Sequence, residues 1–213
     1  LVINESKKKP TLLILLTGGG TLAEFNKQHE LVPGEWTVDK FLSYLPEVKQ
    51  LANIAIKEVF HDDSANFTSK HWIKLAETIY KEIPKYDGIV VIHGTDTMAY
   101  TASALSFFLQ NLPIPIVLTG SNIPISFISS PSRELVADAI KIAGHADLAE
   151  VVVLSHKTII RGNRAKKVEE IDLRKFESIN LAPLGMVQNN AIYIERHALK
   201  RNAKLKPTLH VNI

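Results

Sequence analysis

The segment that most constrains the fold is residues 88–92, Gly-Ile-Val-Val-Ile, a short and uninterrupted apolar run. A strand that is apolar on both faces is typical of a parallel sheet covered by helices on both sides. A helical pattern follows at once, with one apolar stripe formed by Ala99, Ala102, Leu105 and Leu109. The sequence therefore predicts a buried strand that leads directly into a helix.

The same alternation of strand and helix patterns continues along the chain. The other predicted strands cover residues 11–16, 53–58, 115–118 and 151–154. One amphipathic helix follows Thr68, which can cap it, and another runs from about residue 132 to 143 with Gly144 as its C-cap. Asn189 and Asn190 stand between two apolar runs and predict a terminal hairpin. We therefore expect an α/β fold with an open, mostly parallel sheet flanked by helices.

Residues 93–98, His-Gly-Thr-Asp-Thr-Met, connect the buried strand to its helix. Open parallel sheets bind ligands at the carboxyl ends of their strands, where helix N-termini present free N–H groups. A hydroxyl and a carboxylate beside a glycine are suited to a site at this position. Thr and Asp are also good helix caps, so the motif by itself leaves a capping role open.

A glycine-rich loop follows the first strand, where residues 17–23 read Thr-Gly-Gly-Gly-Thr-Leu-Ala. Glycines let backbone N–H groups approach a ligand closely, and Thr21 adds a hydroxyl beside them. The loop lacks the Gly-Lys-Ser/Thr ending of a P-loop and the spacing of a dinucleotide site. It therefore favours a small polar ligand over a phosphate.

Taken together, these motifs resemble the L-asparaginase family of bacterial and archaeal type. A related type is the asparaginase-like subunit of the archaeal glutamyl-tRNA(Gln) amidotransferase, which shares most of the blocks. Residues 176–180 also resemble the segment that follows the family's lysine. The five matching blocks, in the family's order, are residues 19–23, 63–68, 93–98, 115–121 and 161–167.

The resemblance implies an amidohydrolase that releases ammonia from L-asparagine through a threonine acyl-enzyme. It implies Thr21 as the nucleophile. It also implies Thr95, Asp96 and Lys167 as a supporting catalytic triad, and the Arg-x-x-Lys spacing selects Lys167 rather than Lys166. Positioned acid–base groups of this kind typically contribute about 10²–10⁴ in rate.

Four residues are expected to hold the substrate. A carboxylate suits an α-amino group and a hydroxyl suits an α-carboxylate, which points to Asp63 and Ser64; the family spacing favours Asp63 over Asp62. Gly94 belongs to the same set, and Ser121 would offer its backbone to the substrate amide. An ordinary turn remains the alternative for residues 62–64. The sequence does not separate asparagine from glutamine as the substrate.

The chain departs from the family pattern at three places. Residues 24–31 contain no tyrosine, where many family members place one against the nucleophile, and Phe25 cannot supply that hydroxyl. Residues 129–133 stand where an aspartate is common. Residues 168–171, Val-Glu-Glu-Ile, replace the His-Thr that follows the family's lysine.

Composition excludes several other classes. The chain has no cysteine, hence no disulfide or thiolate chemistry, which suits a cytoplasmic protein. The apolar run at residues 11–16 is too short for a signal peptide or a membrane span. A net charge of +3 is small, and the basic stretch at residues 196–206 indicates a solvated connector rather than an RNA contact. We expect no cofactor and no metal, because His61 and His93 have no third ligand at a recognisable spacing.

The last predictions concern domains and partners. We expect residues 1–195 to form the catalytic domain and residues 196–213 to form a connector and the first strand of a further domain. Apolar residues alternate over 207–213, and no partner strand is expected from within this chain, so we predict a homo-oligomer. Two other functions stay open: a non-catalytic or partner-dependent domain, and the ammonia-producing subunit of a tRNA-dependent amidotransferase.

Overall fold

The computed structural model describes residues 8–170 and 175–211. The helices are α1 (Val38–Tyr44), α2 (Val48–Leu51), α3 (Ser69–Glu82), α4 (Met98–Phe108) and α5 (Pro131–His145). The strands are β1 (Thr11–Leu16), β2 (Ala23–Phe25), β3 (Leu31–Pro33), β4 (Asn53–Glu58), β5 (Gly88–Ile92), β6 (Leu109–Gln110), β7 (Ile116–Thr119), β8 (Val151–Ser155), β9 (Thr158–Arg161), β10 (Ala165–Lys167), β11 (Phe176–Ser178), β12 (Gly185–Gln188), β13 (Ala191–Ile194) and β14 (Thr208–Leu209).

The main sheet has the strand order β13-β12-β9-β8-β7-β5-β1-β4. Strands β8, β7, β5, β1 and β4 are parallel, and β9, β12 and β13 extend the sheet in antiparallel fashion. The predicted open and mostly parallel sheet is therefore confirmed. The terminal hairpin is also confirmed, and its turn residues Asn189 and Asn190 have φ of 49° and 61°, as a tight two-residue hairpin turn requires.

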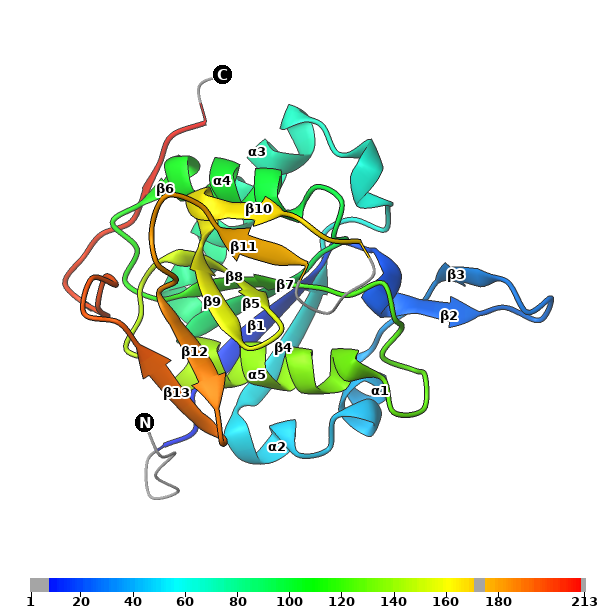
Figure 1. Ribbon diagram of the computed structural model, residues 1–213. Helices are drawn as coiled ribbons and strands as arrows, with labels where there is room; N and C mark the ends of the chain where they lie inside the picture. The colour runs from blue at the N-terminus through cyan, green and yellow to red at the C-terminus, as the bar shows by residue number, and fades with distance from the viewer. Residues whose placement is uncertain (1–7, 171–174, 212–213) are drawn as a thin grey trace.

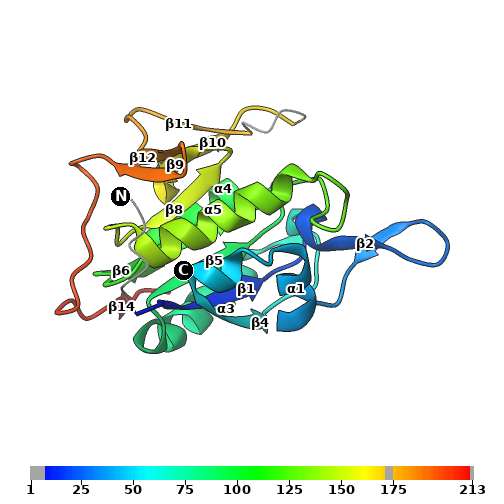
Figure 2. The same ribbon diagram turned by 90° about the horizontal axis from the view of Figure 1, so that it is seen from below.

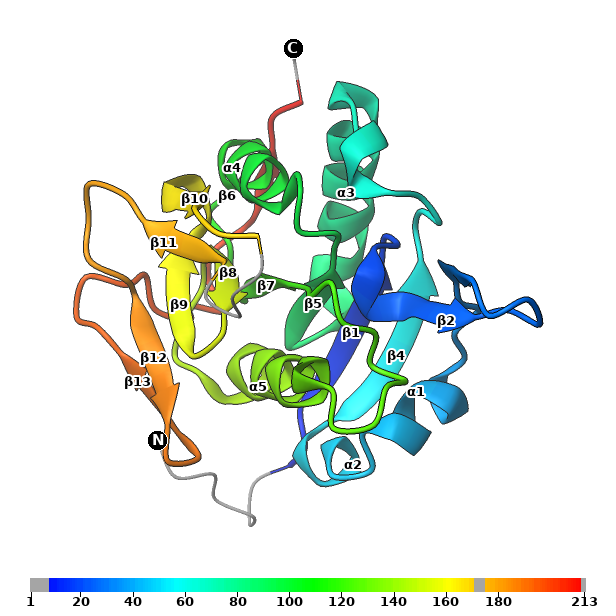
Figure 3. The same ribbon diagram turned by 45° about the vertical axis from the view of Figure 1, so that its right-hand side comes forward.

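Helices cover both faces of the sheet, with α3 and α4 on one side and α1, α2 and α5 on the other (Figures 1 and 3). Successive side chains of a strand point to opposite faces, so β1 contributes to two cores. Leu12 and Ile14 pack in the core that contains α5, whereas Leu13 and Leu15 pack in the core that contains α3 and α4. This burial on both faces is why β1 and β5 are continuous apolar runs.

The prediction that Gly144 caps the second amphipathic helix is wrong. Helix α5 continues through Gly144 to His145, and Ala146 is its C-cap. A Cβ atom at position 144 would lie 2.9 Å from Cγ of Pro10. The glycine is therefore explained by the close approach of the segment that leads into β1.

The expectation that residues 207–213 would find no partner strand within the chain is also wrong. Thr208 and Leu209 form β14, which pairs with β6 in antiparallel fashion. Leu209 and Val211 pack against the core on the α3 and α4 side. Residues 212 and 213, the end of the predicted strand, lie outside the described residues.

Candidate active site

The predicted site residues gather where β1 and β5 end. The chain leaves β1 for β4 on one side while β5 lies on the other, which is the arrangement at which open α/β sheets bind ligands. Gly19 has φ of 86°, and a Cβ atom there would lie 2.6 Å from Cα of Gly94. Glycine at both positions therefore lets the loops that follow β1 and β5 touch.

Thr21 is buried, and both hydrogen bonds of its hydroxyl go to the backbone of Ser121. Its Oγ1 accepts from Ser121 N at 2.7 Å and donates to Ser121 O at 3.0 Å. Ser121 lies in the loop that follows β7, so the hydroxyl joins the loops at the ends of β1 and β7. The two residues that the sequence assigned to the nucleophile and to the substrate amide are thus in direct contact.

Thr95 is also buried, and it contacts the next residue of the same loop. Its Oγ1 donates to Oδ1 of Asn122 at 2.8 Å. Ser121 and Asn122 therefore bring the hydroxyls of Thr21 and Thr95 to one loop. No motif of the sequence singled out Asn122, although it stands directly after Ser121.

Lys167 lies with two carboxylates. Its Nζ is 2.7 Å from Asp96 Oδ1 and 2.6 Å from Glu170 Oε2, and its side chain is 15% exposed. Burial by itself would lower the pKa of Lys167, but the hydrogen bonds to Asp96 and Glu170 outweigh it and raise that pKa above its ordinary value. Lys166, the alternative, is exposed.

The expected triad is therefore brought together only in part. Lys167 and Asp96 form an ion pair, whereas the hydroxyl of Thr95 bonds to Asn122 instead of Lys167. Glu170 was missed as a site residue, although the spacing of three residues from Lys167 was visible. It belongs to the segment in which the chain departs from the family pattern.

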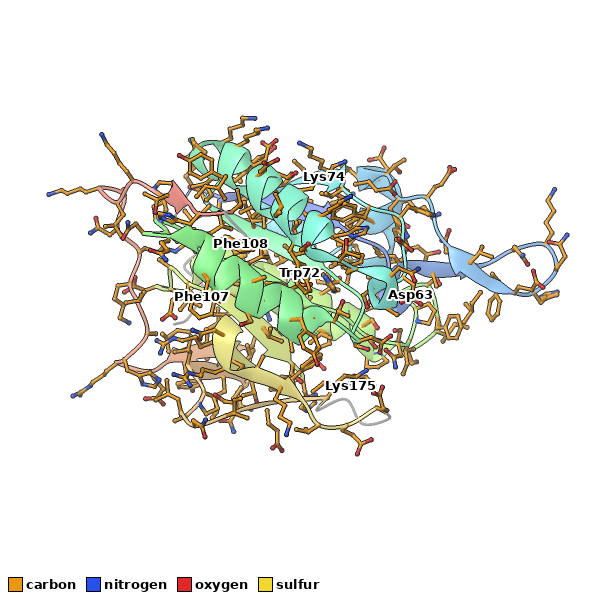
Figure 4. The ribbon with its side chains drawn as sticks, turned by 90° about the horizontal axis from the view of Figure 1, so that it is seen from above. Asp63, Trp72, Lys74, Phe107, Phe108 and Lys175 are labelled. Carbon is orange, nitrogen blue, oxygen red and sulfur yellow. The ribbon has the colours of Figure 1, made fainter. Side chains whose placement is uncertain are left out.

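Asp63 and Ser64 lie at the carboxyl end of β4, beside the N-terminal ends of α3 and α4, where Figure 4 labels Asp63. The Asp63 carboxylate is exposed and accepts from Ala65 N at 2.9 Å. Ser64 is buried, and its Oγ has no hydrogen-bond partner among the described residues. A Cβ atom on Gly94 would lie 2.5 Å from that Oγ, so Ser64 and Gly94 are adjacent.

Asp62, the neighbouring carboxylate, has a local structural role. Its Oδ1 accepts from Asp63 N at 2.8 Å and from Asn66 Nδ2 at 2.9 Å. The hydrogen bond from Asn66 is the main cause that lowers the pKa of Asp62. Both carboxylates therefore take part in this turn, Asp62 with two hydrogen bonds and Asp63 with one.

A cleft of about 670 Å³ opens beside Asp96 and Lys167. It extends between α4 and the segment that includes β10, and Tyr100, Val168 and Ile179 contribute apolar walls. One end of the cleft thus carries the ion pair.

The segment that lacks a tyrosine forms a two-stranded arm. Strands β2 and β3 pair in antiparallel fashion, and the arm projects from the body of the molecule (Figures 1 and 2). Phe25 on this arm is 56% exposed and stacks on Phe127, with ring centroids 5.3 Å apart.

Two further observations limit what the site can hold. Over residues 8–170 and 175–211, no group of three or more His, Cys, Asp or Glu side chains is arranged to bind a metal ion. Both ring nitrogens of His93 are engaged in hydrogen bonds, to Gly94 O and to Thr101 Oγ1.

Over residues 8–170 and 175–211, no helix has the length and apolar character needed to cross a bilayer.

The chain is similar to known proteins over most of its length. A family model described as asparaginase, N-terminal, matches residues 11–200. A glutamyl-tRNA(Gln) amidotransferase subunit from Methanosphaera stadtmanae is 38% identical over 215 residues, which cover 97% of this chain and 49% of the relative. L-asparaginase 1 of Escherichia coli is 34% identical over 180 residues, which cover 83% of this chain and 53% of the relative.

The fold is also similar to that of solved asparaginases. The crystal structure of L-asparaginase I from Vibrio cholerae matches with a TM-score of 0.85 and 30% identity, over 95% of this chain and 61% of that one. The chain spans about half the length of the curated relatives that it matches.

Proposed function

Since the chain belongs to the asparaginase family, we propose that it carries the site of an amidohydrolase that releases ammonia from L-asparagine. The observation that carries this proposal is the meeting of two threonine hydroxyls at one loop, through Ser121 and Asn122, next to the Lys167–Asp96 ion pair. Acyl transfer needs a nucleophile, a charged relay and a polar pocket at the same place, and these groups supply them.

In the proposed reaction, Oγ1 of Thr21 attacks the side-chain amide carbon of the substrate. The carbon–nitrogen bond breaks, the hydroxyl proton is transferred to the departing nitrogen, and ammonia leaves. Water then cleaves the acyl-threonine ester and restores the hydroxyl while releasing the acid. The Thr21 hydroxyl now donates to Ser121 O, so attack requires that this hydrogen bond be given up.

Thr95, Asp96 and Lys167 would assist these proton transfers. Because the pKa of Lys167 is raised, this side chain enters the reaction as an ammonium ion. An ammonium paired with Asp96, the residue after Thr95, can stabilise the negative charge that develops as the hydroxyl proton of Thr21 moves to the leaving nitrogen. Asp96 would hold that ammonium in place.

Four residues would orient the substrate. The exposed carboxylate of Asp63 would bind the α-amino group, and the unpartnered hydroxyl of Ser64 would donate to the α-carboxylate. Gly94 keeps the space next to Ser64 open, and the Ser121 carbonyl, which has a second lone pair besides the one that accepts from Thr21, would accept from the substrate amide.

The test is ammonia release from L-asparagine, L-glutamine and D-asparagine, with light scattering on the same sample. We expect release from L-asparagine that Thr21→Ala abolishes. If the chain releases no ammonia from any of the three amides, the result would contradict the hydrolase function and favour the non-catalytic or partner-dependent domain.

A second candidate is the ammonia-producing component of a tRNA-dependent amidotransferase. The match to the glutamyl-tRNA(Gln) amidotransferase protein of Methanosphaera stadtmanae over 97% of this chain favours it. It predicts ammonia release that depends on a partner protein. The domain assignment of residues 1–195 and 196–213, the homo-oligomer and the cytoplasmic location remain proposals as well.

A further inference from the structure

A row of hydrogen bonds links α3 to the loop that follows β5, which is the loop that contains Thr95. Nε1 of Trp72 donates to Oγ1 of Thr101 at 2.9 Å. Oγ1 of Thr101 lies 2.9 Å from Nε2 of His93, and Nδ1 of His93 lies 2.7 Å from the carbonyl oxygen of Gly94. Figure 4 shows Trp72 where α3 meets α4, so the row starts between the two helices.

The chemistry of the groups fixes the direction of every bond in this row. An indole N–H can only donate, so the Thr101 hydroxyl accepts from Trp72; its own proton is then free to point at Nε2 of His93, which accepts it when the ring is neutral and carries its proton on Nδ1. A carbonyl oxygen can only accept, so the ring proton of His93 is on Nδ1. The imidazole is therefore a neutral Nδ1–H tautomer. Its full burial agrees, because burial lowers the pKa of His93 to about 4.

The last hydrogen bond of the row reaches the backbone of Gly94, the residue directly before Thr95 and Asp96. Gly94 has no side chain that could pack against its neighbours, and a Cβ atom there would collide with Ser64. Side-chain packing therefore does not hold this residue in place. The hydrogen bond from His93 to the Gly94 carbonyl supplies that anchor. The ring of Phe67 packs edge-on against His93, with centroids 4.9 Å apart, and restricts its rotation.

We propose that Trp72, Thr101 and His93 are positioning residues that hold Gly94 and thereby set the placement of Thr95 and Asp96 for amide hydrolysis. This inference rests on the proposed hydrolase function. None of the three side chains needs to touch the substrate. Their effect on the reaction would be transmitted through the backbone of residues 93–96.

The decisive variant is Thr101→Val, which keeps the shape of the side chain and removes its hydroxyl. It leaves Nε2 of His93 without a donor and the Trp72 N–H without an acceptor, so the tautomer is no longer fixed. We expect kcat for L-asparagine to fall about 10²-fold, as for a displacement of about 1 Å, with KM changed much less. Thr101→Ser restores the hydroxyl and should rescue kcat.

The matched control is Thr119→Val. Thr119 is equally buried, and its hydroxyl donates to Leu154 O at 3.2 Å, whereas its contact with His93 is through the backbone carbonyl, which accepts from His93 N at 2.9 Å and is kept in the variant. It should lose similar thermal stability and keep kcat. If Thr101→Val does not fold, Trp72→Phe, which removes the indole N–H and replaces the indole by a smaller ring, carries the same kinetic comparison.

Nitrogen-15 NMR of histidine-labelled protein provides a readout that does not depend on activity. We expect a neutral Nδ1–H tautomer for His93 in the parent chain, and in Thr101→Val a mixed tautomer with displaced amide signals of Gly94, Thr95 and Asp96. An Nε2–H tautomer in the parent chain, undisplaced amide signals, or an unchanged kcat in Thr101→Val would each overturn the inference. If the parent chain hydrolyses no amide, the proposed function fails, and the NMR comparison with Thr119→Val still decides the positioning role.

Discussion

The hydroxyl of Thr21 shows how a single side chain can combine structural and chemical roles. It is 1% exposed and bridges the loops after β1 and β7 through two hydrogen bonds to Ser121. Removing a buried hydroxyl leaves its partners unsatisfied, at a cost of about 1–3 kcal/mol. Loss of activity in a Thr21 variant therefore needs a control of equal structural cost.

Thr17 provides this control for the first prediction. Its hydroxyl is equally buried and donates to Ile92 O at 3.0 Å, at the base of the same loop. We expect Thr21→Ala and Thr17→Ala to lower the melting temperature to a similar extent, and only Thr21→Ala to abolish ammonia release. Equal losses of activity would show that the glycine loop matters only for structure.

The second prediction compares the neighbouring lysines. Nζ of Lys167 lies 2.7 Å from Oδ1 of Asp96, whereas Lys166 is exposed. We expect Lys167→Met to lower kcat by about 10²–10⁴ and Lys166→Met to have little effect. Steady-state kinetics would check this, and the reverse order would move the catalytic assignment by one residue.

The third prediction concerns the effect of His93 on the stability of the protein at low pH. Its folded pKa of about 4 lies below the ordinary 6.5, so the unfolded chain binds the extra proton first as the pH falls. The free energy of unfolding should therefore decrease between about pH 6.5 and pH 4, by about 3 kcal/mol from this group, and the decrease should level off below pH 4. Urea unfolding at several pH values, compared with His93→Gln, measures the difference; equal slopes for the two proteins would contradict a neutral buried His93.

At the scale of elements, the basic segment after β13 is tied to the end of a helix. Arg201 donates to the carbonyls of Ala143, Ala146 and Asp87, the first two of which belong to the C-terminal end of α5. A cation there satisfies carbonyls that the helix leaves open and complements its dipole. The prediction of a solvated connector is therefore wrong for Arg201.

The fourth prediction follows from this arrangement. Arg201→Met should lower the free energy of unfolding by at least about 1.5–3 kcal/mol, because the carbonyls lose charged donors. Lys200→Met is the control, since Lys200 is exposed and lies 3.8 Å from Asp147, a pair worth under about 1 kcal/mol. Chemical denaturation would compare the two, and similar small losses would show that Arg201 does not secure α5.

At the scale of the whole molecule, two aromatic side chains are exposed on α4, and one of them, Tyr100, lines the cleft. Tyr100 and Phe107 on α4 are 65% and 59% exposed. Exposed aromatic side chains beside a site are typical of an interaction surface. The pairing between β14 and β6 means that an unpaired strand no longer argues for an oligomer, and this surface supplies another reason.

The fifth prediction is therefore a dimer or larger assembly in light scattering, which Tyr100→Ser combined with Phe107→Ser should reduce to monomer. The double variant should keep its melting temperature, because both side chains are mostly outside the core. A parent chain that is monomeric at all concentrations measured would contradict the prediction.

The sequence by itself determined the five parallel strands of the main sheet, its terminal hairpin and the loops that follow the strands, but it did not predict β9. Continuous apolar runs predicted β1 and β5, and the Asn189-Asn190 pair predicted the terminal hairpin, because these signals depend on residues adjacent in the chain. The Arg-x-x-Lys spacing of the family resemblance selected Lys167 over Lys166, and Lys167 is the lysine that pairs with Asp96.

The tertiary structure alone decided which groups meet at the strand ends. Thr21 contacts Ser121, 100 residues away, and Thr95 contacts Asn122, 27 residues away. The contact of Arg201 with the end of α5 and the close approach of Gly144 to Pro10 also join residues that are far apart in the sequence. Local periodicity fixes which face a side chain takes, whereas its hydrogen-bond partner depends on the order of strands in the sheet, which places distant loops side by side.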